Sequence, residues 1–218
     1  ASLVFQSFGV PNSAAVTMLK TIQEMKFFLR TAYGDSEGCA GSTLEIKTQG
    51  LCQGNGAAPA GWTVISITLL NAHKARGHSA QFRCPISSRN GNLAAIVYVD
   101  DTDLIHINLK DREIMEDTHY CLQESISSWG KLLLASGGAL KPEKCFAYLV
   151  DFEWQPDGTW RYVDRTEDPE FEVRIPLAHG RSATIARLGV NEARKTLGYI
   201  TCPSGNPSAS IERMKDQA

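Results

Sequence analysis

The stretch Leu93–Asn108, with the sequence LAAIVYVDDTDLIHIN, contains two apolar runs separated by a pair of acidic residues. Leu93–Val99 is the first run and Thr102–Asn108 is the second, and both are rich in the β-branched and aromatic residues that favour strands. Only Asp100 and Asp101 lie between them. The stretch therefore predicts two antiparallel strands joined by a tight turn at the two aspartates.

Two adjacent carboxylates at such a turn repel each other unless a cation neutralises them. Carboxylate oxygens suit Mg²⁺, which binds proteins through one or two carboxylates together with substrate phosphates. Two such ions can hold the attacking and leaving oxygens of a phosphoryl transfer. Asp100 and Asp101 are therefore the candidate metal ligands and catalytic residues. The alternative that the pair is simply a polar turn stays open, and we interpret the following carboxylate, Asp103, as structural.

A glycine-rich loop provides a second candidate site. Gln53, Gly54, Asn55 and Gly56 precede a predicted helix that begins at about Ala57. Glycine lets the backbone approach a ligand closely, and the free N–H groups of a helix N-terminus bind phosphate. The loop thus predicts a contact with a nucleotide or a nucleic acid, and a flexible turn without function is the alternative.

Helices and strands alternate over the rest of the chain. The apolar spacing predicts helices at 13–26, 57–75 and 112–135, the last ending at 136–138. Alternating patterns and turn residues predict hairpins that pair 27–33 with 43–48 across a turn at 34–38, and 145–152 with 159–163. Further strands are predicted at 183–188 and 196–201. This order is typical of an α+β fold, in which helices cover one face of an antiparallel sheet and the other face is free for a ligand.

Composition limits the class of protein without deciding its function. The 218 residues, 43% hydrophobic and 21% charged, are enough for one domain with one substantial core. The most apolar stretch, 57–70, is too short to span a bilayer, so we expect no membrane partner. The six cysteines lack metal or redox spacing and fit a reducing intracellular compartment, the cytoplasm or the nucleus. The net charge of −2 neither indicates nor excludes a nucleic-acid binder.

Several motifs together resemble the palm domain of reverse transcriptases. Tyr98-Val99-Asp100-Asp101 is similar to the Tyr-x-Asp-Asp signature of that family, and 53–59 is similar to its Gln-Gly loop. The segment 137–145 resembles the part of the family with an Asn-x-x-Lys pattern, where Lys141 stands near the Asn and Lys144 matches the Lys. Residues 196–199 resemble the Leu-Gly turn of the primer grip, and 30–36 resemble a hairpin of retroelement polymerases from eukaryotic microbes. The resemblance spans residues 9–203.

The resemblance implies an RNA-directed DNA polymerase of a retroelement, with a right-hand palm fold and a two-metal mechanism that uses Mg²⁺ or Mn²⁺. Its implied partners are an RNA template, a DNA primer and deoxynucleoside triphosphates. Asp100 would be the essential metal ligand with Asp101 beside it, and Lys144 would lie near the triphosphate, where a cation stabilises the leaving pyrophosphate. The residues implied to contact primer, template or incoming base pair are Arg30, Gln53, Gly54, Asn55, Gly56, Tyr98, Val99, Gly198 and Tyr199.

One element of the family is not found in the matched residues. Reverse transcriptases carry a further metal-binding Asp on a strand before the helix that we place at 13–26, and residues 1–12 contain no Asp or Glu. We therefore expect 1–203 to be a partial palm, 204–218 to begin the connection to a thumb, and the chain alone to bind metal weakly and polymerise nothing. Two alternatives stay open. One is a viral-type RNA-dependent RNA polymerase, which usually has Gly-Asp-Asp, and the other is a non-catalytic polymerase relic that binds nucleic acid.

Overall fold

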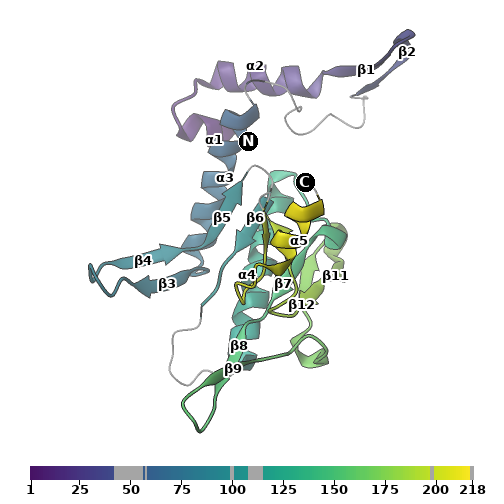
Figure 1. The fold of residues 1–218 in the computed structure, drawn as a ribbon. Coiled ribbons are helices and arrows are strands. Elements are labelled where there is room, and N and C mark those ends of the chain that lie inside the picture. The colour runs from purple at the N-terminus through teal and green to yellow at the C-terminus, as the bar shows by residue number, and fades with distance from the viewer. Residues whose placement is uncertain (42–55, 57, 99–100, 108–114, 197–198, 217–218) are drawn as a thin grey trace. The chain divides into compact units, whose positions relative to one another are not determined.

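The computed structural model describes residues 1–41, 56, 58–98, 101–107, 115–196 and 199–216. The chain forms two compact units, Ala1–Asn71 and Ala72–Ala218, and each is described by itself. Figure 1 shows their helices and strands in chain order. Helices combined with small, mostly antiparallel sheets make an α+β fold, as the sequence predicts. None of the described helices is both long and apolar enough to cross a bilayer.

The first unit contains two helices, a hairpin and the start of a third helix. Its elements are α1 (Ser2–Ser7), α2 (Asn12–Gln23), β1 (Lys26–Thr31), β2 (Gly34–Gly41) and most of α3 (Ala58–Ala75). α2 and α3 confirm the helices predicted at 13–26 and 57–75, although α2 ends earlier than predicted. Phe5 of α1 and both Ala15 and Ile22 of α2 are buried, which places the apolar side of these short helices inside the unit.

The turn predicted at 34–38 is wrong, because these residues lie inside β2. Thr31 pairs with Gly34 and Arg30 pairs with Asp35, so the chain turns between Thr31 and Gly34. Glycine and serine disfavour strands, but cross-strand contacts stabilise this one. The Arg30 guanidinium donates two hydrogen bonds to the Asp35 carboxylate, of 2.6 and 2.9 Å. The return strand predicted at 43–48 lies outside the described residues.

The strands of the second unit pair two by two. The antiparallel pairs are β3 (Ala80–Arg83) with β4 (Asn90–Leu93), β5 (Ala95–Tyr98) with β6 (Asp101–Leu104), β8 (Asp151–Trp154) with β9 (Trp160–Val163), β10 (Arg174–Pro176) with β11 (Ser182–Thr184), and β13 (Arg194–Thr196) with β14 (Tyr199–Thr201). β7 (Phe146–Tyr148) pairs in parallel with β12 (Ala186–Leu188). The one continuous antiparallel sheet that the sequence predicts is not formed by the described strands, because each of these short strands pairs along one edge.

The strand predicted at 145–152 is divided into β7 and β8, which have different partners. Ala147 of β7 is buried and enters the core, whereas Phe152 of β8 is 54% exposed. The change of partner occurs across Leu149 and Val150, which belong to neither strand. β8 and β9 form the predicted hairpin, and Gly158 in its turn has a φ of +84°, a conformation that glycine adopts without strain.

The long helix α4 (Met115–Ser136) confirms the third predicted helix. Ile126 and Trp129 are buried on the face that the helical spacing predicts. The helix ends where the sequence predicts, because Gly137 has a φ of +91° and the Gly138 N–H donates to a carbonyl of the last turn, at 2.9 Å. A left-handed glycine directly after the last turn is a common way to end a helix.

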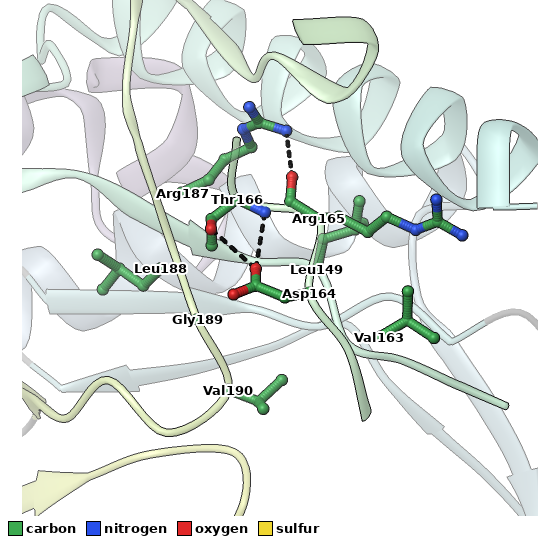
Figure 2. A pocket seen from close by; sticks show the side chains of 9 residues that line it. All are labelled: Leu149, Val163, Asp164, Arg165, Thr166, Arg187, Leu188, Gly189 and Val190. Atoms are coloured by element: carbon green, nitrogen blue, oxygen red, sulfur yellow. Dashed lines mark hydrogen bonds between the residues drawn. The ribbon is translucent and has the colours of Figure 1, made fainter. Parts of the chain in front are cut away.

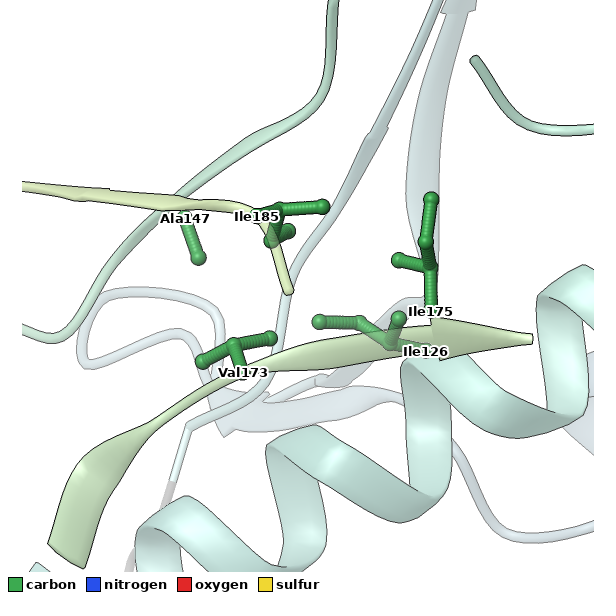
Figure 3. Close-up of a cluster of buried hydrophobic side chains, with 5 residues drawn as sticks. All are labelled: Ile126, Ala147, Val173, Ile175 and Ile185. Atoms are coloured by element: carbon green, nitrogen blue, oxygen red, sulfur yellow. The ribbon is translucent and has the colours of Figure 1, made fainter. Parts of the chain in front are cut away.

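The core of the second unit lies between α4 and the strands β7 and β10. Figure 3 shows its side chains, which come from segments far apart in the sequence: Ile126, Ala147, Val173, Ile175 and Ile185. Leu104 of β6 packs against this cluster and is half-buried. Burial of each large aliphatic side chain stabilises a fold by about 1.5–3 kcal/mol. The same cluster therefore supports β6, which begins with Asp101.

Short helices and one terminal helix complete the unit. They are η1 (Pro142–Lys144), η2 (Pro169–Phe171), η3 (Ala178–Gly180) and α5 (Ser208–Asp216). α5 packs against β14, where the Ser210 hydroxyl donates to the Ile200 carbonyl oxygen at 2.6 Å. The assignment of 1–203 to a partial palm and of 204–218 to a connecting segment stays a prediction.

Candidate metal and nucleic-acid site

The hairpin β5–β6, which we call the acidic hairpin, carries the residues predicted to bind metal. Tyr98 pairs with Asp101 across the hairpin, and Ile96 pairs with Asp103. Asp101 is therefore the first residue of β6, which corrects the prediction that both aspartates form the turn. Val99 and Asp100 lie outside the described residues.

The two faces of the acidic hairpin have different surroundings. Directly paired residues, and residues two apart along one strand, point to the same face of a sheet. Tyr98, Ile96, Asp101 and Asp103 therefore share one face, and Leu104 lies on the other face, toward the core. Tyr98 is 64% exposed and Asp101 is also exposed. Tyr98 and Asp101 on this face are thus accessible to a ligand.

The carboxyl groups on this face interact with each other. Burial raises the pKa of Asp103 above its ordinary value, and the negative charge of Asp101 raises it further. No described side chain forms a hydrogen bond or ion pair with either carboxyl group. From the sequence Asp103 is interpreted as structural, and its position two residues after Asp101 on a strand predicts that both carboxylates share one face.

The donor atoms of the acidic face fit a magnesium ion. Asp101 and Asp103 offer carboxylate oxygens, and Mg²⁺ binds proteins through one or two carboxylates while it keeps waters and substrate phosphates. Within the described parts of the chain, no three or more His, Cys, Asp or Glu side chains gather closely enough to hold a metal. The described carboxylates alone do not form such a group, and the metal site stays a prediction because its predicted principal ligand, Asp100, lies outside the described residues.

Lys144, the predicted triphosphate contact, ends η1 and is exposed. Its ammonium group has no hydrogen-bond or ion-pair partner among the described residues, whereas neighbouring Lys141 binds Glu143 at 3.3 Å. No described interaction joins Lys144 to Asp101. Lys144 is thus an exposed cation near the start of β7 whose charge helps to lower the pKa of Glu143, and its role at the triphosphate stays a prediction.

The predicted nucleic-acid contacts lie in different parts of the chain. In the first unit, Arg30 is occupied by Asp35, and Gly56 is exposed just before α3. An added Cβ at Gly56 would meet nothing within 4 Å, so packing inside the chain does not require glycine there. In the second unit, Tyr199 begins β14 and pairs with Thr196. Gln53, Gly54, Asn55 and Gly198 lie outside the described residues.

A small cavity elsewhere in the second unit contains none of the predicted residues. Figure 2 shows its lining, and its volume is about 10 Å³. The Asp164 carboxylate accepts hydrogen bonds from the Thr166 amide and hydroxyl, at 2.9 and 2.8 Å, which hold the pKa of Asp164 below its ordinary value. Arg187 donates to the Arg165 carbonyl oxygen at 2.8 Å. These polar groups bind one another, so they offer few free hydrogen-bonding atoms to a ligand in the cavity.

Comparisons with protein-family models, with curated proteins and with solved structures found no match to this chain.

Proposed function

We propose that this chain is the palm of a template-directed nucleic-acid polymerase, and specifically of an RNA-directed DNA polymerase. The observation that carries the proposal is the acidic face of β5–β6. Tyr98 and Asp101 bracket the Tyr-Val-Asp-Asp motif and pair directly, and Asp103 adds a second carboxylate to the same face. Both carboxyl groups lack a cationic partner among the described residues, which supports a role in binding cations from outside the chain.

The proposed reaction is attack of a primer 3′-hydroxyl on the α-phosphate of a deoxynucleoside triphosphate, with pyrophosphate leaving. Bound Mg²⁺ or Mn²⁺ would lower the barrier by neutralising charge on the attacking and leaving oxygens. Asp100 and Asp101 would hold the ions. Asp103 would add negative charge to the acidic face, which strengthens the attraction for divalent cations.

Other described residues fit roles around this reaction. The exposed ring of Tyr98 is on the acidic face and is available to pack against a primer end. The exposed Lys144, which forms no ion pair with a described residue, is available to stabilise charge on the leaving pyrophosphate. These placements support the proposal.

Primer extension by the whole protein that contains these residues tests the proposal. The substrates are an RNA template, an annealed DNA primer, deoxynucleoside triphosphates and Mg²⁺. We expect Asp100→Asn to reduce extension by at least about 100-fold, because loss of a metal ligand removes several kcal/mol of transition-state stabilisation. Unchanged thermal melting would show that the fold survives. Retained extension in this variant would remove Asp100 from the site.

The same assay separates the other candidate functions. Extension that prefers ribonucleoside triphosphates would indicate an RNA-dependent RNA polymerase. Binding of primer–template without extension by the whole protein would indicate a relic that kept the fold and lost the chemistry. The chain of 218 residues alone is expected to extend no primer and to bind Mn²⁺ weakly. Robust synthesis by that chain would contradict the predicted position of the further metal-binding Asp.

A further inference from the structure

A large open groove lies in the second unit between α4 and the hairpin β10–β11. Its volume is about 610 Å³, within the roughly 300–1,000 Å³ typical of small-molecule pockets. Four residues of α4 form one side, Gln123, Ser127, Lys131 and Leu134, and the segment 174–182 forms the other. No residue of the acidic hairpin lines it, so the groove is a separate feature of the molecule.

The walls of the groove are held firmly against each other. The Gln123 side chain bonds to both backbone groups of Arg174: its amide nitrogen donates to the carbonyl oxygen at 2.7 Å, and its oxygen accepts from the N–H at 2.8 Å. A Cβ at Gly130 would collide with the Pro176 ring, so α4 approaches β10 more closely than another residue would allow. The groove therefore lies between two elements, α4 and β10, whose relative position is held by hydrogen bonds and close packing.

The charged residues that line the groove are all basic. Its lining contains Lys131, Arg174 and Arg181, and these described lining residues include no Asp or Glu. Arg174 is neutralised by Glu172, at 2.6 Å. Lys131 and Arg181 are exposed, and neither side chain has an ion-pair partner in the described chain. A concave surface lined by uncompensated cations concentrates anionic ligands.

The floor of the groove is apolar. Ile175 is buried at its base, and Leu134, Pro176 and Leu177 are half-buried along it. At the tip of the β10–β11 connection, His179 is exposed and has a φ of +59°, in the left-handed region that few residues other than glycine adopt. Leu177 N–H donates to the Arg181 carbonyl oxygen at 2.8 Å and closes this connection.

We propose that this groove binds a single strand of nucleic acid, with Lys131 and Arg181 on its phosphates and the apolar floor against its bases. A single strand presents a charged backbone and apolar base faces side by side. A duplex presents mainly its backbone, and would leave the floor without a partner. The proposal uses none of the predicted catalytic residues, so it can hold or fail independently of the proposed polymerase activity.

Fluorescence anisotropy of a short labelled oligo(dT) with the 218-residue chain tests the proposal. The variant Lys131→Ala/Arg181→Ala should weaken binding by about tenfold, roughly equally for different base sequences. It should also reduce the slope of log affinity against log salt by about 1.4, because about 0.7 is lost for each phosphate contact to a single strand. The matched control is Arg213→Ala/Lys215→Ala, which removes the same charges from α5 and should change neither quantity appreciably.

Several outcomes would overturn the proposal. Equal weakening by both double variants, with unchanged melting temperatures, would show attraction to the surface in general. Tighter binding of a duplex of the same sequence would exclude the single strand, and displacement by equal concentrations of inorganic phosphate would mean that the groove takes isolated phosphates. Equal displacement by polyglutamate would show that the groove selects charge alone. The binding measurement needs no deoxynucleoside triphosphate and no Mg²⁺, which separates this result from any failure of the polymerase assay.

Discussion

Two hairpins of the second unit have strands of equal length, four residues each, and opposite surface chemistry. The acidic hairpin β5–β6 presents Asp101 and Asp103 on its open face. The hairpin β8–β9, which we call the aromatic hairpin, pairs Phe152 with Tyr162 and Trp154 with Trp160. These four rings share one face, because directly paired residues and residues two apart point the same way.

The two hairpins also differ in how their charges are satisfied. On the aromatic hairpin, Arg161 binds Glu153 directly across the strands, and Arg165 binds Asp151 at 3.1 Å. On the acidic hairpin, no described cation approaches Asp101 or Asp103. The pKa values follow this difference: the hydrogen bond from Arg161 lowers that of Glu153, and burial raises that of Asp103.

This contrast supports the proposed cation site on the acidic hairpin. On the aromatic hairpin, Glu153 and Asp151 both have an arginine partner, and the exposed surface consists of apolar rings, with Trp154 68% exposed. The acidic hairpin is packed through Leu104 onto the core, yet its carboxyl groups lack partners among the described residues. Negative charge that the fold itself does not neutralise is what a cation site needs before the cation arrives. The following predictions test this contrast.

The largest expected difference concerns activity. In the whole protein, Asp101→Asn should lower primer extension by at least about 100-fold, because it removes a carboxylate from the proposed metal site. Glu153→Gln makes the same chemical change on the aromatic hairpin and should leave extension near the wild-type rate. Both rates are measured at saturating Mg²⁺ with one template and primer. Equal losses in the two variants would mean that neither carboxylate has a specific role.

Removing a side chain should lower stability more on the acidic hairpin, which packs onto the core, than on the exposed face of the aromatic hairpin. Leu104→Ala should lower the free energy of unfolding by about 2 kcal/mol, at the low end for a core leucine because Leu104 is only half-buried. Trp154→Ala removes a larger side chain and should cost less than about 0.5 kcal/mol, as is usual for exposed positions. Urea unfolding of the 218-residue chain measures both. A larger loss for Trp154→Ala would show that the aromatic face is covered in solution.

The acidic hairpin and the long helix were predictable because their signals are local. The apolar runs around Asp100 and Asp101 predict β5 and β6, and the helical spacing and the glycines at 137 and 138 predict α4 and its end. β10 was missed even though residues 171–175 alternate, with Phe171, Val173 and Ile175 buried. That alternation was a usable signal for a strand.

Other features depend on contacts that local patterns do not encode. The parallel pairing of β7 with β12 joins segments far apart in the chain, so the choice of partner is decided by packing around Ala147. The raised pKa of Asp103 depends on burial in the folded unit, and the groove near Lys131 depends on the approach of β10 to α4. The Tyr-Val-Asp-Asp motif predicted the position of the acidic hairpin. The roles implied for Asp100, Gln53 and Gly198 in binding metal, template and primer stay predictions, because these residues lie outside the described ones.

The stability of the turn of the aromatic hairpin should depend on Gly158. Gly158→Ala should cost about 1 kcal/mol of unfolding free energy, because alanine is strained at a φ of +84°. Gly158→Asn should cost less, since asparagine adopts the left-handed region more readily. An added Cβ at Gly158 would meet nothing within 4 Å, so the effect would come from backbone strain alone. Equal stability of the alanine variant and the wild type in urea unfolding would contradict this assignment.

The smallest expected effects are opposite pH dependences of the two hairpins. The pKa of Asp103 in the folded chain is raised from an ordinary 3.8, so its contribution to stability is present below 3.8 and is lost as the pH rises through the folded pKa. The pKa of Glu153 is lowered from an ordinary 4.5, so its contribution is present above 4.5 and is lost as the pH falls through the folded pKa.

Single substitutions should therefore shift stability in opposite directions near neutral pH. Asp103→Asn should raise the melting temperature relative to the wild type, with the gain vanishing below pH 3.8. Glu153→Gln should lower it slightly, because an exposed ion pair is screened by solvent, and that loss should vanish in acid. Melting curves between about pH 3 and pH 7 without divalent ions give both differences.

Added Mg²⁺ should reduce the gain from Asp103→Asn, because a cation on the acidic face stabilises the charged carboxylate of the wild type. A gain that Mg²⁺ leaves unchanged would place Asp103 outside the metal site.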